Sequence, residues 1–354
     1  MTQETPPKLS VVITNYNYAG FIARAIDSVL SQNVKVELVV VDDCSTDNSR
    51  DVIASYGDRV IPVFQPVNQG QGGAFNAGFP HTTGDLVLFL DADDFLLPGA
   101  AWIIQSNYDP AIAMYLYRMH YADADDELGG FFPPLEVPFA TGNVSAQLRD
   151  IGSYSGTITS GMVFSRKALE QVMPVDAKAF AYGGDGYLTA TVPLYGPVRG
   201  LDQAICAYRL HPSQHTQFAR VYAKRGRWRI EHHQARFRTI REHAARLGLP
   251  VADDLGERDT DHLQERLISL MFGPDEHPIP TDTRANLLAK LKRANRDRFG
   301  SKALPRNAWW ILIGLLPAGA ARTVFSWKID VAARPAWMNR LGRTMRRRLG
   351  IVTG

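Results

Sequence analysis

The sequence has few cysteines, no long uncharged apolar run and no strong excess of one charge. Its 354 residues include two cysteines, Cys44 and Cys206, which lie far apart and show no metal-ligand spacing. A disulfide framework is therefore disfavoured and a reducing compartment is favoured. No uncharged apolar stretch reaches the roughly 18 residues of a transmembrane helix, and the N-terminal residues lack the apolar segment of a signal peptide. We expect a cytoplasmic protein.

Several function classes are also disfavoured by missing patterns. The net charge is only +3, so the whole molecule is not expected to bind nucleic acid. Neither a Ser-His-Asp nor a Cys-His order suggests covalent catalysis, and no repeats or low-complexity segments occur. The glycine pattern at residues 70–73 does not follow the first predicted strand in Gly-x-Gly-x-x-Gly form, which disfavours an NAD-type enzyme.

The first hundred residues alternate between strand and helix patterns. Apolar, β-prone runs cover residues 9–13, 36–41, 60–64 and 85–90, and helical patterns cover 21–30, 45–55 and a segment opened by the glycine-rich loop 68–78. Pro62 places the third strand near an edge. This order predicts an α/β fold with a mostly parallel sheet, flanked by helices and joined by right-handed crossovers.

Polar residues follow three of these strands. Thr14 and Tyr16 follow the first, Asp42 and Asp43 the second, and the segment Asp91–Asp94 the fourth. Parallel strands bring these ends to one edge, where ligands of open α/β sheets bind. Crowded carboxylates would repel one another unless a hard cation such as Mg²⁺ or Mn²⁺ lay between them. Two alternatives stay open, a solvated acidic turn at 91–94 and a helix-capping role for Asp42.

Four linked motifs resemble the family 2 glycosyltransferases of GT-A fold, in order and spacing, over roughly residues 8 to 100. They are Val11–Asn17, Val40–Asp47, Asn68–Gly70 with Asn76–Gly78, and Leu90–Asp94. The resemblance implies that Thr14, Tyr16 and Asp43 hold the nucleobase and ribose of a UDP-sugar. It implies a metal, Mn²⁺ or Mg²⁺, at Asp93 with Asp91. The further donor-binding residues expected from the motifs are Asn15, Asp42, Asn68, Gly70, Asn76, Ala92 and Asp94. The chain departs from the family at Gln71-Gly72-Gly73, so any phosphate contact there would come from backbone N–H groups; a plain helix start is the alternative.

The middle of the chain is expected to build the acceptor side. A strand is predicted at residues 112–117, a solvated hairpin tip at the acidic residues 123–127, and a strand leading into a capped helix at 159–169. Asp185 opens an apolar helix at 187–195 and by its residue type fits a helix N-terminal acid. By resemblance it is the general base of inverting transfer, which takes the acceptor proton. His211, or alternatively His215, matches a family segment and could reach the metal or the diphosphate, although a loop histidine often does neither.

The composition changes after about residue 217. We expect a GT-A domain at residues 1–216, a helical extension at 217–300 with helices near 260–272 and 282–299, and an apolar and basic segment at 301–354. The basic run at 220–248 is either a solvated helix face or a contact with anionic lipid or a pyrophosphate-linked acceptor. Residues 308–317 are either an interfacial membrane segment beside a basic tail or a buried helix or subunit contact.

The sequence as a whole predicts a metal-assisted inverting glycosyltransferase that transfers a sugar from a nucleotide-diphosphate donor to a glycan or polyprenyl-linked acceptor. A peripheral contact with the inner face of the plasma membrane and an oligomeric state are compatible with it. The alternatives are a sugar-phosphate nucleotidyltransferase and a non-catalytic scaffold of the same fold. The nucleotidyltransferase would be expected to carry a basic, glycine-rich loop where residues 14–17 stand.

Overall fold

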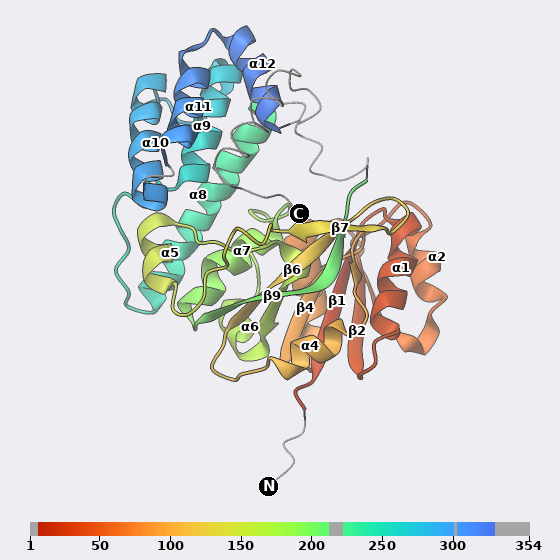
Figure 1. Cartoon of the computed structure of the whole chain (residues 1–354). Coiled ribbons are helices and arrows are strands. Elements are labelled where there is room, and N and C mark those ends of the chain that lie inside the picture. The colour runs from red at the N-terminus through yellow and green to blue at the C-terminus, as the bar shows by residue number, and fades with distance from the viewer. Residues whose placement is uncertain (1–5, 212–221, 301–302, 330–354) are drawn as a thin grey trace. The chain divides into compact units, whose positions relative to one another are not determined.

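The computed structural model describes residues 6–211, 222–300 and 303–329 (Figure 1). The chain divides into two compact units. The α/β unit consists of residues 1–214 and 232–255, and the helical unit consists of residues 215–231 and 256–354. Helix α8 (Tyr222–Arg246) therefore contributes its first part to the helical unit and the remainder to the α/β unit.

Nine strands of the described residues form one sheet in the α/β unit. They are β1 (Leu9–Asn15), β2 (Val36–Asp42), β3 (Ile61–Phe64), β4 (Leu86–Asp91), β5 (Phe95–Leu96), β6 (Met114–Ala122), β7 (Leu128–Phe132), β8 (Met162–Ser165) and β9 (Val198–Arg209). The order is β3-β2-β1-β4-β8-β6-β9-β5, with β7 paired to β6. The predicted fold class is confirmed, and β3 lies at the edge as Pro62 indicated.

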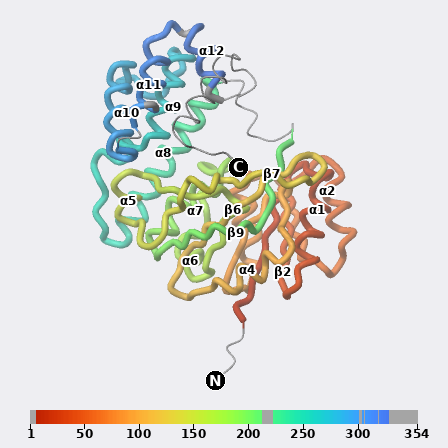
Figure 2. The backbone as a smooth tube through the Cα atoms, viewed as in Figure 1, coloured from red at the N-terminus to blue at the C-terminus, as the bar shows by residue number. Residues whose placement is uncertain are grey.

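Parallel pairing is concentrated in the first half of the sheet. Strands β3, β2, β1 and β4 are mutually parallel, whereas β8 runs antiparallel to both β4 and β6. Strand β9 lies beside β6 in parallel although some 80 residues separate them along the chain (Figure 2). The sheet is therefore mixed, because β8 and β5 run antiparallel to their neighbours.

Seven helices of the described α/β residues precede α8. They are α1 (Ala19–Leu30), α2 (Ser49–Ala54), α3 (Gly70–Gly78), α4 (Ala100–Ser106), α5 (Ser145–Ile151), α6 (Arg166–Val172) and α7 (Gly184–Thr191). The helix expected from residue 45 begins only at Ser49, because polar side chains before it bind backbone N–H groups of the segment that follows β1. The Ser45 hydroxyl accepts the Asn17 N–H at 2.9 Å, and Asp47 accepts the Ala19 N–H at 2.9 Å.

Side-chain alternation along the strands builds a core on each face of the sheet. In β1, Leu9, Val11 and Ile13 join the cluster that contains α1 and α4, while Val12 joins the cluster of α3, α6 and α7. Alternate residues of a strand point to opposite faces. A strand covered on both faces has to be apolar throughout, which is why these strands read as continuous apolar runs.

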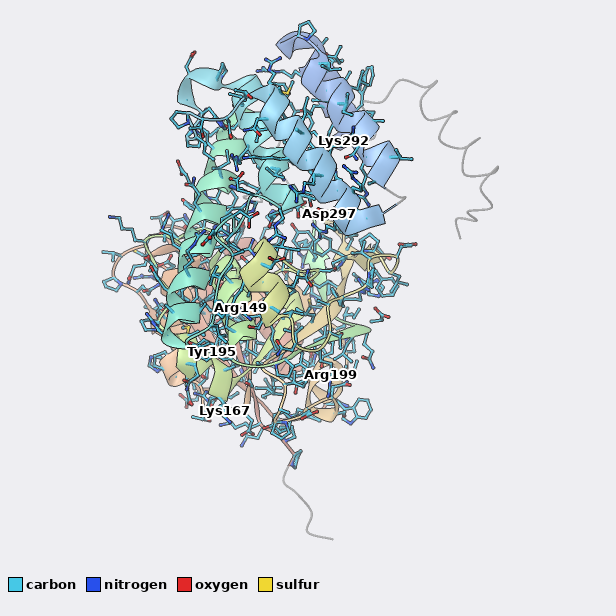
Figure 3. The ribbon with its side chains drawn as sticks, turned by 90° about the vertical axis from the view of Figure 1, so that its left-hand side faces the viewer. Arg149, Lys167, Tyr195, Arg199, Lys292 and Asp297 are labelled. Carbon is cyan, nitrogen blue, oxygen red and sulfur yellow. The ribbon has the colours of Figure 1, made fainter. Side chains whose placement is uncertain are left out.

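The helical unit has its own apolar core. Its helices after α8 are α9 (Thr260–Phe272), α10 (Arg284–Phe299), α11 (Ala303–Leu315) and α12 (Ala318–Ile329). The predicted helices at 260–272 and 282–299 are thus confirmed. Leu267, Leu291 and Trp310 pack in one cluster. Lys292 and Asp297 of α10 are exposed on its outer side (Figure 3).

A buried charge network also joins elements of this unit. The Arg266 guanidinium, 2% exposed, donates to both carboxylate oxygens of Asp282 at 2.8 and 2.5 Å. Asp282 also contacts His277 at 3.0 Å, and Arg266 contacts Glu257 at 2.5 Å. Breaking such a network by removing one partner leaves an uncompensated buried charge, so these contacts fix the geometry around α9.

Helix α11 has one buried and one exposed apolar face. Trp310 and Ile313 are buried, whereas Leu304, Leu312 and Leu315 are 75%, 46% and 74% exposed. Among the described residues, the helices are too short or too polar for any one to traverse a bilayer. The basic tail beyond residue 329 lies outside the described residues.

Candidate functional site

Strand register brings the predicted polar residues to one edge of the sheet. Asn15 of β1 is opposite Asp42 of β2, and Thr14 is opposite Asp91 of β4. The Asp43 N–H donates to the Asn15 carbonyl at 2.8 Å, and the Ala92 N–H donates to the Thr14 carbonyl at 3.1 Å. The predicted convergence of strand ends is confirmed.

The Asp42 carboxylate is occupied by groups of the protein itself. It is fully buried and accepts hydrogen bonds from Asn15 Nδ2 at 2.9 Å, from the Ser45 N–H at 3.0 Å and from Arg50 Nε at 2.8 Å. These contacts favour a structural role, close to the capping alternative. A donor-binding role for Asp42 stays a prediction that the contacts do not favour.

Asp43 holds the start of the glycine loop. Its oxygens accept the Gln69 N–H at 2.8 Å, the Gly70 N–H at 2.7 Å and Gln65 Nε2 at 2.7 Å. Burial raises the pKa of Asp43, and the two backbone donors partly offset that effect. A carboxylate has about four acceptor positions, so these three bonds leave room for one more donor, which fits the predicted nucleoside contact.

Gly70 lies where no other residue would fit. Its φ is +72°, and a Cβ there would come within 2.2 Å of the Ala181 carbonyl oxygen. Asn68 accepts the Gly70 N–H at 3.2 Å. Asn76, predicted to bind the donor, instead exchanges two hydrogen bonds with the backbone of Val175, at 2.8 and 2.7 Å. The motif residues of this loop thus join α3 to the segment before α7.

Gln71, which the sequence reasoning treated only as a departure from the family, is the link between two predicted site elements. Its Nε2 donates to Asp91 Oδ1 at 2.8 Å and lies 3.2 Å from Thr159 Oγ1. Its Oε1 accepts the Gly184 N–H at 2.8 Å, at the first residue of α7. One amide therefore connects the end of β4 to the helix that carries Asp185.

Asp185 lies in the first turn of α7, as predicted, and the helix starts three residues earlier than expected. The turn before it requires Gly183, whose φ is +74°. The His232 ring of α8 fills the space beside this turn, because a Cβ on Gly186 would lie 2.2 Å from His232 Nε2. The negative charge of Asp185 contributes to raising the pKa of Asp91, so these two carboxylates share one electrostatic environment.

The carboxylates after β4 repel one another. Burial first, and then the charge of Asp93, raise the pKa of Asp91 to about 7. The same two causes, with Asp91 added, raise the pKa of Asp94 well above its usual range. Burial and the same carboxylates also raise the pKa of the Tyr18 hydroxyl. A cation bound among these groups would relieve this repulsion.

His211 contacts Asp93 directly. Its Nε2 lies 3.0 Å from Asp93 Oδ2, and its ring packs against Phe21 with centroids 4.5 Å apart. The alternative candidate, His215, lies outside the described residues. The predicted pair of Asp93 and His211 is therefore brought together, whereas Asp91 faces Gln71 instead.

Arg209 joins the acidic hairpin to this site. Its backbone N–H donates to Asp94 Oδ1 at 3.1 Å and its Nε donates to the Asp93 carbonyl at 3.0 Å. Its guanidinium also pairs with Asp126, which Arg24 contacts at 2.8 Å. The hairpin predicted at residues 123–127 is confirmed, but a wholly solvated tip is wrong for Asp126, because two arginines converge on it.

The described residues contain no ready-made group of three or more His, Cys, Asp and Glu side chains for a metal. A Mg²⁺-type ion needs only one or two protein carboxylates when water and substrate phosphates supply the remaining ligands. Asp93 fits that limited role, since it contacts His211 through Oδ2 and its side chain is 13% exposed. The crowded carboxylates therefore fit a metal held jointly with a substrate, not a closed protein cage.

The remaining predicted site residues differ in solvent exposure. Tyr16 is 38% exposed and Thr14 9% exposed at the end of β1, whereas Ala92 is 1% exposed. Thr14 and Tyr16 can face a ligand at this edge. Ala92 contributes through its backbone, and a role for its side chain is not favoured.

Comparisons with known proteins agree with this architecture. Residues 10–105 match the family model described as glycosyl transferase family 2. An uncharacterized glycosyltransferase of Nostoc sp. is 37% identical over 210 residues, which cover 58% of this chain and 65% of the relative. The GalNAc(5)-diNAcBac-PP-undecaprenol beta-1,3-glucosyltransferase of Campylobacter jejuni is 38% identical over 99 residues, 27% of this chain and 32% of that protein. This chain thus spans just under two thirds of the first relative and about a third of the second.

Solved structures share the fold at low sequence identity. The mannosyltransferase PcManGT from Pyrobaculum calidifontis, in complex with GDP-Man and Mn²⁺, aligns with a TM-score of 0.52 and 17% identity over 93% of this chain and 85% of that one. S. aureus TarS 1-349, in complex with UDP, aligns with a TM-score of 0.50 and 16% identity over 91% of each chain. These structures are similar in the GT-A architecture of the sheet and its helices. The family 2 match covers residues 10–105, and the solved structures add a likeness of fold alone.

Proposed function

We propose that the chain is an inverting glycosyltransferase that moves a sugar from a nucleotide-diphosphate donor, with UDP as the expected nucleotide, to a glycan or lipid-linked acceptor. The main support is the Gln71 bridge, which connects Asp91 at the end of β4 to the N-terminus of the helix carrying Asp185. It joins the carboxylates suited to a diphosphate–metal complex to the carboxylate suited to proton removal.

Asp185 is the proposed general base. An acceptor hydroxyl is a poor nucleophile, and a carboxylate within about 3 Å can take its proton as the oxygen attacks C1 of the donor sugar. Inversion requires this attack on the face opposite the departing nucleotide. The opening of α7 by Gly183 and the bond from Gly184 to Gln71 hold Asp185 in a defined position for that step.

The nucleoside is proposed to lie across the ends of β1 and β2. Thr14 and Tyr16 supply side chains there, and Asp43 retains acceptor capacity for a base N–H or a ribose hydroxyl. A divalent ion held by Asp93 with the donor diphosphate would neutralise negative charge that develops on the leaving group. Asp94, held by the Arg209 N–H, keeps the turn after β4 in place.

The similar proteins support the donor and acceptor classes without identifying them. TarS is bound to UDP in one solved structure, and PcManGT to GDP-Man and Mn²⁺ in another. The Campylobacter relative is named for an undecaprenol-linked acceptor. A sugar-phosphate nucleotidyltransferase is less well supported, because residues 14–17 form a strand end with no basic loop. A non-catalytic scaffold would not need both Asp93 and Asp185.

The donor assignment is tested by substitution of Asp93. Asp93→Ala should abolish the Mn²⁺-dependent part of UDP binding, measured by titration calorimetry with and without Mn²⁺. Asp125→Ala, in the exposed hairpin tip, is the matched control and should bind as the unmodified protein does. Equal UDP affinity in the presence and absence of Mn²⁺ for the unmodified protein would contradict the assignment.

A peripheral membrane contact is proposed for the helical unit. The helical unit (residues 215–231 and 256–354) holds 23 Lys and Arg against 10 Asp and Glu, whereas the α/β unit holds 16 against 26. The exposed leucines of α11 add an apolar face. Basic charge beside exposed apolar side chains favours binding to anionic lipid surfaces, which would bring the enzyme to a lipid-linked acceptor.

A further inference from the structure

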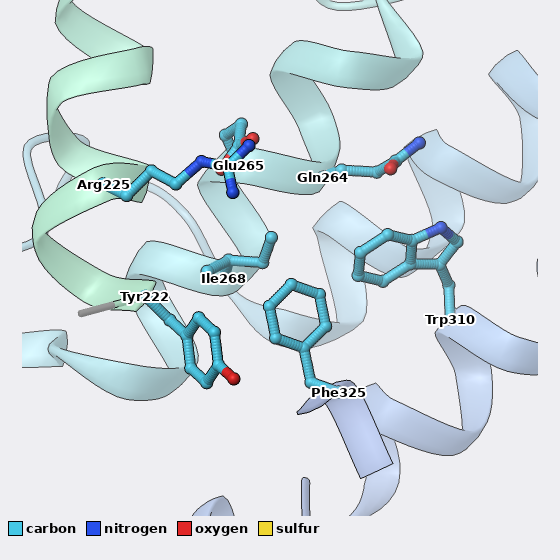
Figure 4. A pocket seen from close by; sticks show the side chains of 7 residues that line it. All are labelled: Tyr222, Arg225, Gln264, Glu265, Ile268, Trp310 and Phe325. Carbon is cyan, nitrogen blue, oxygen red and sulfur yellow. The ribbon is translucent and has the colours of Figure 1, made fainter. Parts of the chain in front are cut away.

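The helical unit contains a pocket that the proposed catalytic site does not use (Figure 4). It has a volume of about 200 Å³ and lies between α8, α9, α11 and α12. Ile268, Trp310 and Phe325 form its apolar walls and are 7%, 3% and 5% exposed. Pockets for drug-sized ligands usually have volumes of about 300–1,000 Å³, so this one suits a single small ring.

Aromatic rings dominate one side of the pocket. Tyr222 and Phe325 meet edge to face with centroids 5.0 Å apart, and Trp310 lies 6.1 Å from Phe325. Figure 4 shows these three rings gathered around one space, with the Tyr222 hydroxyl at the outer end of its ring. Such surfaces favour a ligand with an apolar face and tolerate a polar edge.

Polar groups of complementary kinds occupy the other side. Arg225 offers only donors, Glu265 in its ionised form only acceptors, and Gln264 offers both. Arg225 and Glu265 lie side by side in Figure 4, and the side chain of Gln264, the residue before Glu265 on α9, lies to their right. A purely apolar packing void in a helix bundle would not have these three side chains in its wall.

The charges around the pocket do not favour a simple anion. Burial, together with the adjacent Arg229, lowers the pKa of Arg225, while Glu265 opposes that shift. Glu265 also approaches Arg229 at 3.8 Å. A ligand that both donates and accepts hydrogen bonds suits this mixed wall better than a phosphate or a carboxylate does.

We propose that this pocket binds one pyranose ring of a glycan, so that the helical unit recognises the acceptor. A pyranose has an apolar C–H face and an edge of hydroxyls that donate and accept, which matches the aromatic side and the Arg225, Gln264 and Glu265 side respectively. This inference rests on the proposed function, because glycosyl transfer makes a glycan the expected acceptor.

Saturation-transfer NMR on the full chain tests the pocket. The probes are the methyl glycosides of glucose, galactose, mannose and N-acetylglucosamine, each alone and with saturating UDP and Mn²⁺. We expect saturation of the ring protons of at least one glycoside, unchanged by UDP. Arg225→Gln and, separately, Gln264→Phe, which places a ring at the polar side, should weaken binding at least tenfold.

The matched control is Arg293→Gln, a 77% exposed arginine in the same unit, which should bind as the unmodified chain does. Thermal unfolding of each variant shows that it is folded. The proposal is overturned if no glycoside receives saturation, if UDP displaces the bound glycoside, or if neither Arg225→Gln nor Gln264→Phe weakens binding.

Failure of the pocket and failure of the proposed function give different results. Turnover of a nucleotide sugar without glycoside binding in the pocket would overturn only the inference. Glycoside binding that depends on Arg225 and Gln264, in a protein that binds no nucleotide, would overturn the glycosyltransferase proposal and leave the pocket as a sugar site.

Discussion

The side-chain amide of Gln71 carries the connection between the proposed metal-binding end of β4 and the proposed base. Its two ends bind Asp91 and the Gly184 N–H, which are 93 residues apart in the sequence. The sequence contained a signal for this residue, a long polar side chain among glycines. The hydrogen-bond partners of Gln71 could not be predicted from the sequence, because they depend on how segment 180–184 packs against α3.

Gln71→Leu should reduce turnover about 10- to 100-fold with a smaller effect on UDP binding. The substitution removes all three hydrogen bonds of the Gln71 amide and leaves the Gly184 N–H without its acceptor, at a cost of about 1–3 kcal/mol. Steady-state kinetics with a nucleotide sugar measure the change. Gln147→Leu, at an exposed position on α5, is the control, and equal kinetics for both variants would show that the bridge has no role in catalysis.

Asp185→Asn should leave UDP affinity nearly unchanged and lower turnover by about 10²–10⁴-fold, the range for loss of a general base. The amide keeps the shape of the side chain but cannot accept the acceptor proton. Rate measurements at saturating donor, paired with calorimetry, separate the two effects. Asp125→Asn provides the comparison, and undiminished turnover in Asp185→Asn would remove this residue from the role.

At the scale of elements, the strand and helix patterns of the first hundred residues were readable from the sequence. Strands β1, β2 and β4 are covered on both faces and are therefore apolar along most of their length, whereas the edge strand β3 is largely exposed. The predicted start of α2 is four residues too early, since Ser45 binds a loop N–H, while Asp47 binds both the Ala19 N–H and the N–H of Ser49, where the helix begins. The pairing of β6 with β9 could not be predicted from the sequence, because these strands are distant along the chain.

The contact between α7 and α8 depends on one buried histidine. His243 of α8 lies with Nδ1 2.8 Å from the Tyr195 hydroxyl and Nε2 3.2 Å from the Tyr187 hydroxyl. The Tyr187 hydroxyl donates to the Val172 carbonyl at 2.6 Å. A neutral imidazole with its proton on Nε2 satisfies all three contacts, with Tyr195 donating to Nδ1. Figure 3 marks Tyr195 at this junction.

The contribution of His243 to the stability of the α/β unit should therefore fall in mild acid, whereas protonation of Asp91 and Asp94, whose pKa values are raised, acts in the opposite direction. Burial, followed by the charge of Arg246, lowers the pKa of His243 to about 4. The pKa of His243 in the folded state lies below the unfolded value of about 6.5. Neutral His243 therefore makes its full contribution to the free energy of unfolding above pH 6.5, and this contribution is lost as the pH falls toward 4. The contribution is on the order of 3 kcal/mol.

Denaturant unfolding at pH 7.5, 6 and 5 measures this effect. The difference in unfolding free energy between the unmodified protein and His243→Gln should shrink toward pH 5, while His81→Gln, at an exposed position, should follow the unmodified protein at every pH. His262 of the helical unit, whose pKa burial also lowers to about 4, adds a separate decline that both variants retain. An equally steep pH dependence in His243→Gln would contradict the assignment.

At the scale of the whole molecule, the two units have opposite charge balances. The α/β unit has an excess of acidic residues, 26 against 16 basic ones, and the helical unit has an excess of basic residues, 23 against 10, so that the two nearly cancel in the net charge of +3. The small net charge therefore concealed a strong asymmetry, which is why overall composition gave little information about partners. The apolar run at 308–317 was likewise ambiguous, and α11 proves to have both a buried and an exposed face.

Double substitution Leu312→Ser and Leu315→Ser should lower binding to phosphatidylglycerol vesicles several-fold, as measured by co-sedimentation. Loss of exposed apolar contact explains the decrease, and raised salt should weaken the electrostatic part in both proteins. The double variant Leu128→Ser and Leu135→Ser removes two similarly exposed leucines from the α/β unit. If both double variants bind equally, α11 does not contact the vesicle.

The opposite charge of the two units has a consequence for encounter with a surface. An anionic bilayer attracts the basic helical unit and repels the acidic α/β unit within roughly a Debye length, about 8–10 Å, of the lipid. Each unit would thus respond differently to the same surface before any side chain touches a headgroup, and added salt would weaken both responses.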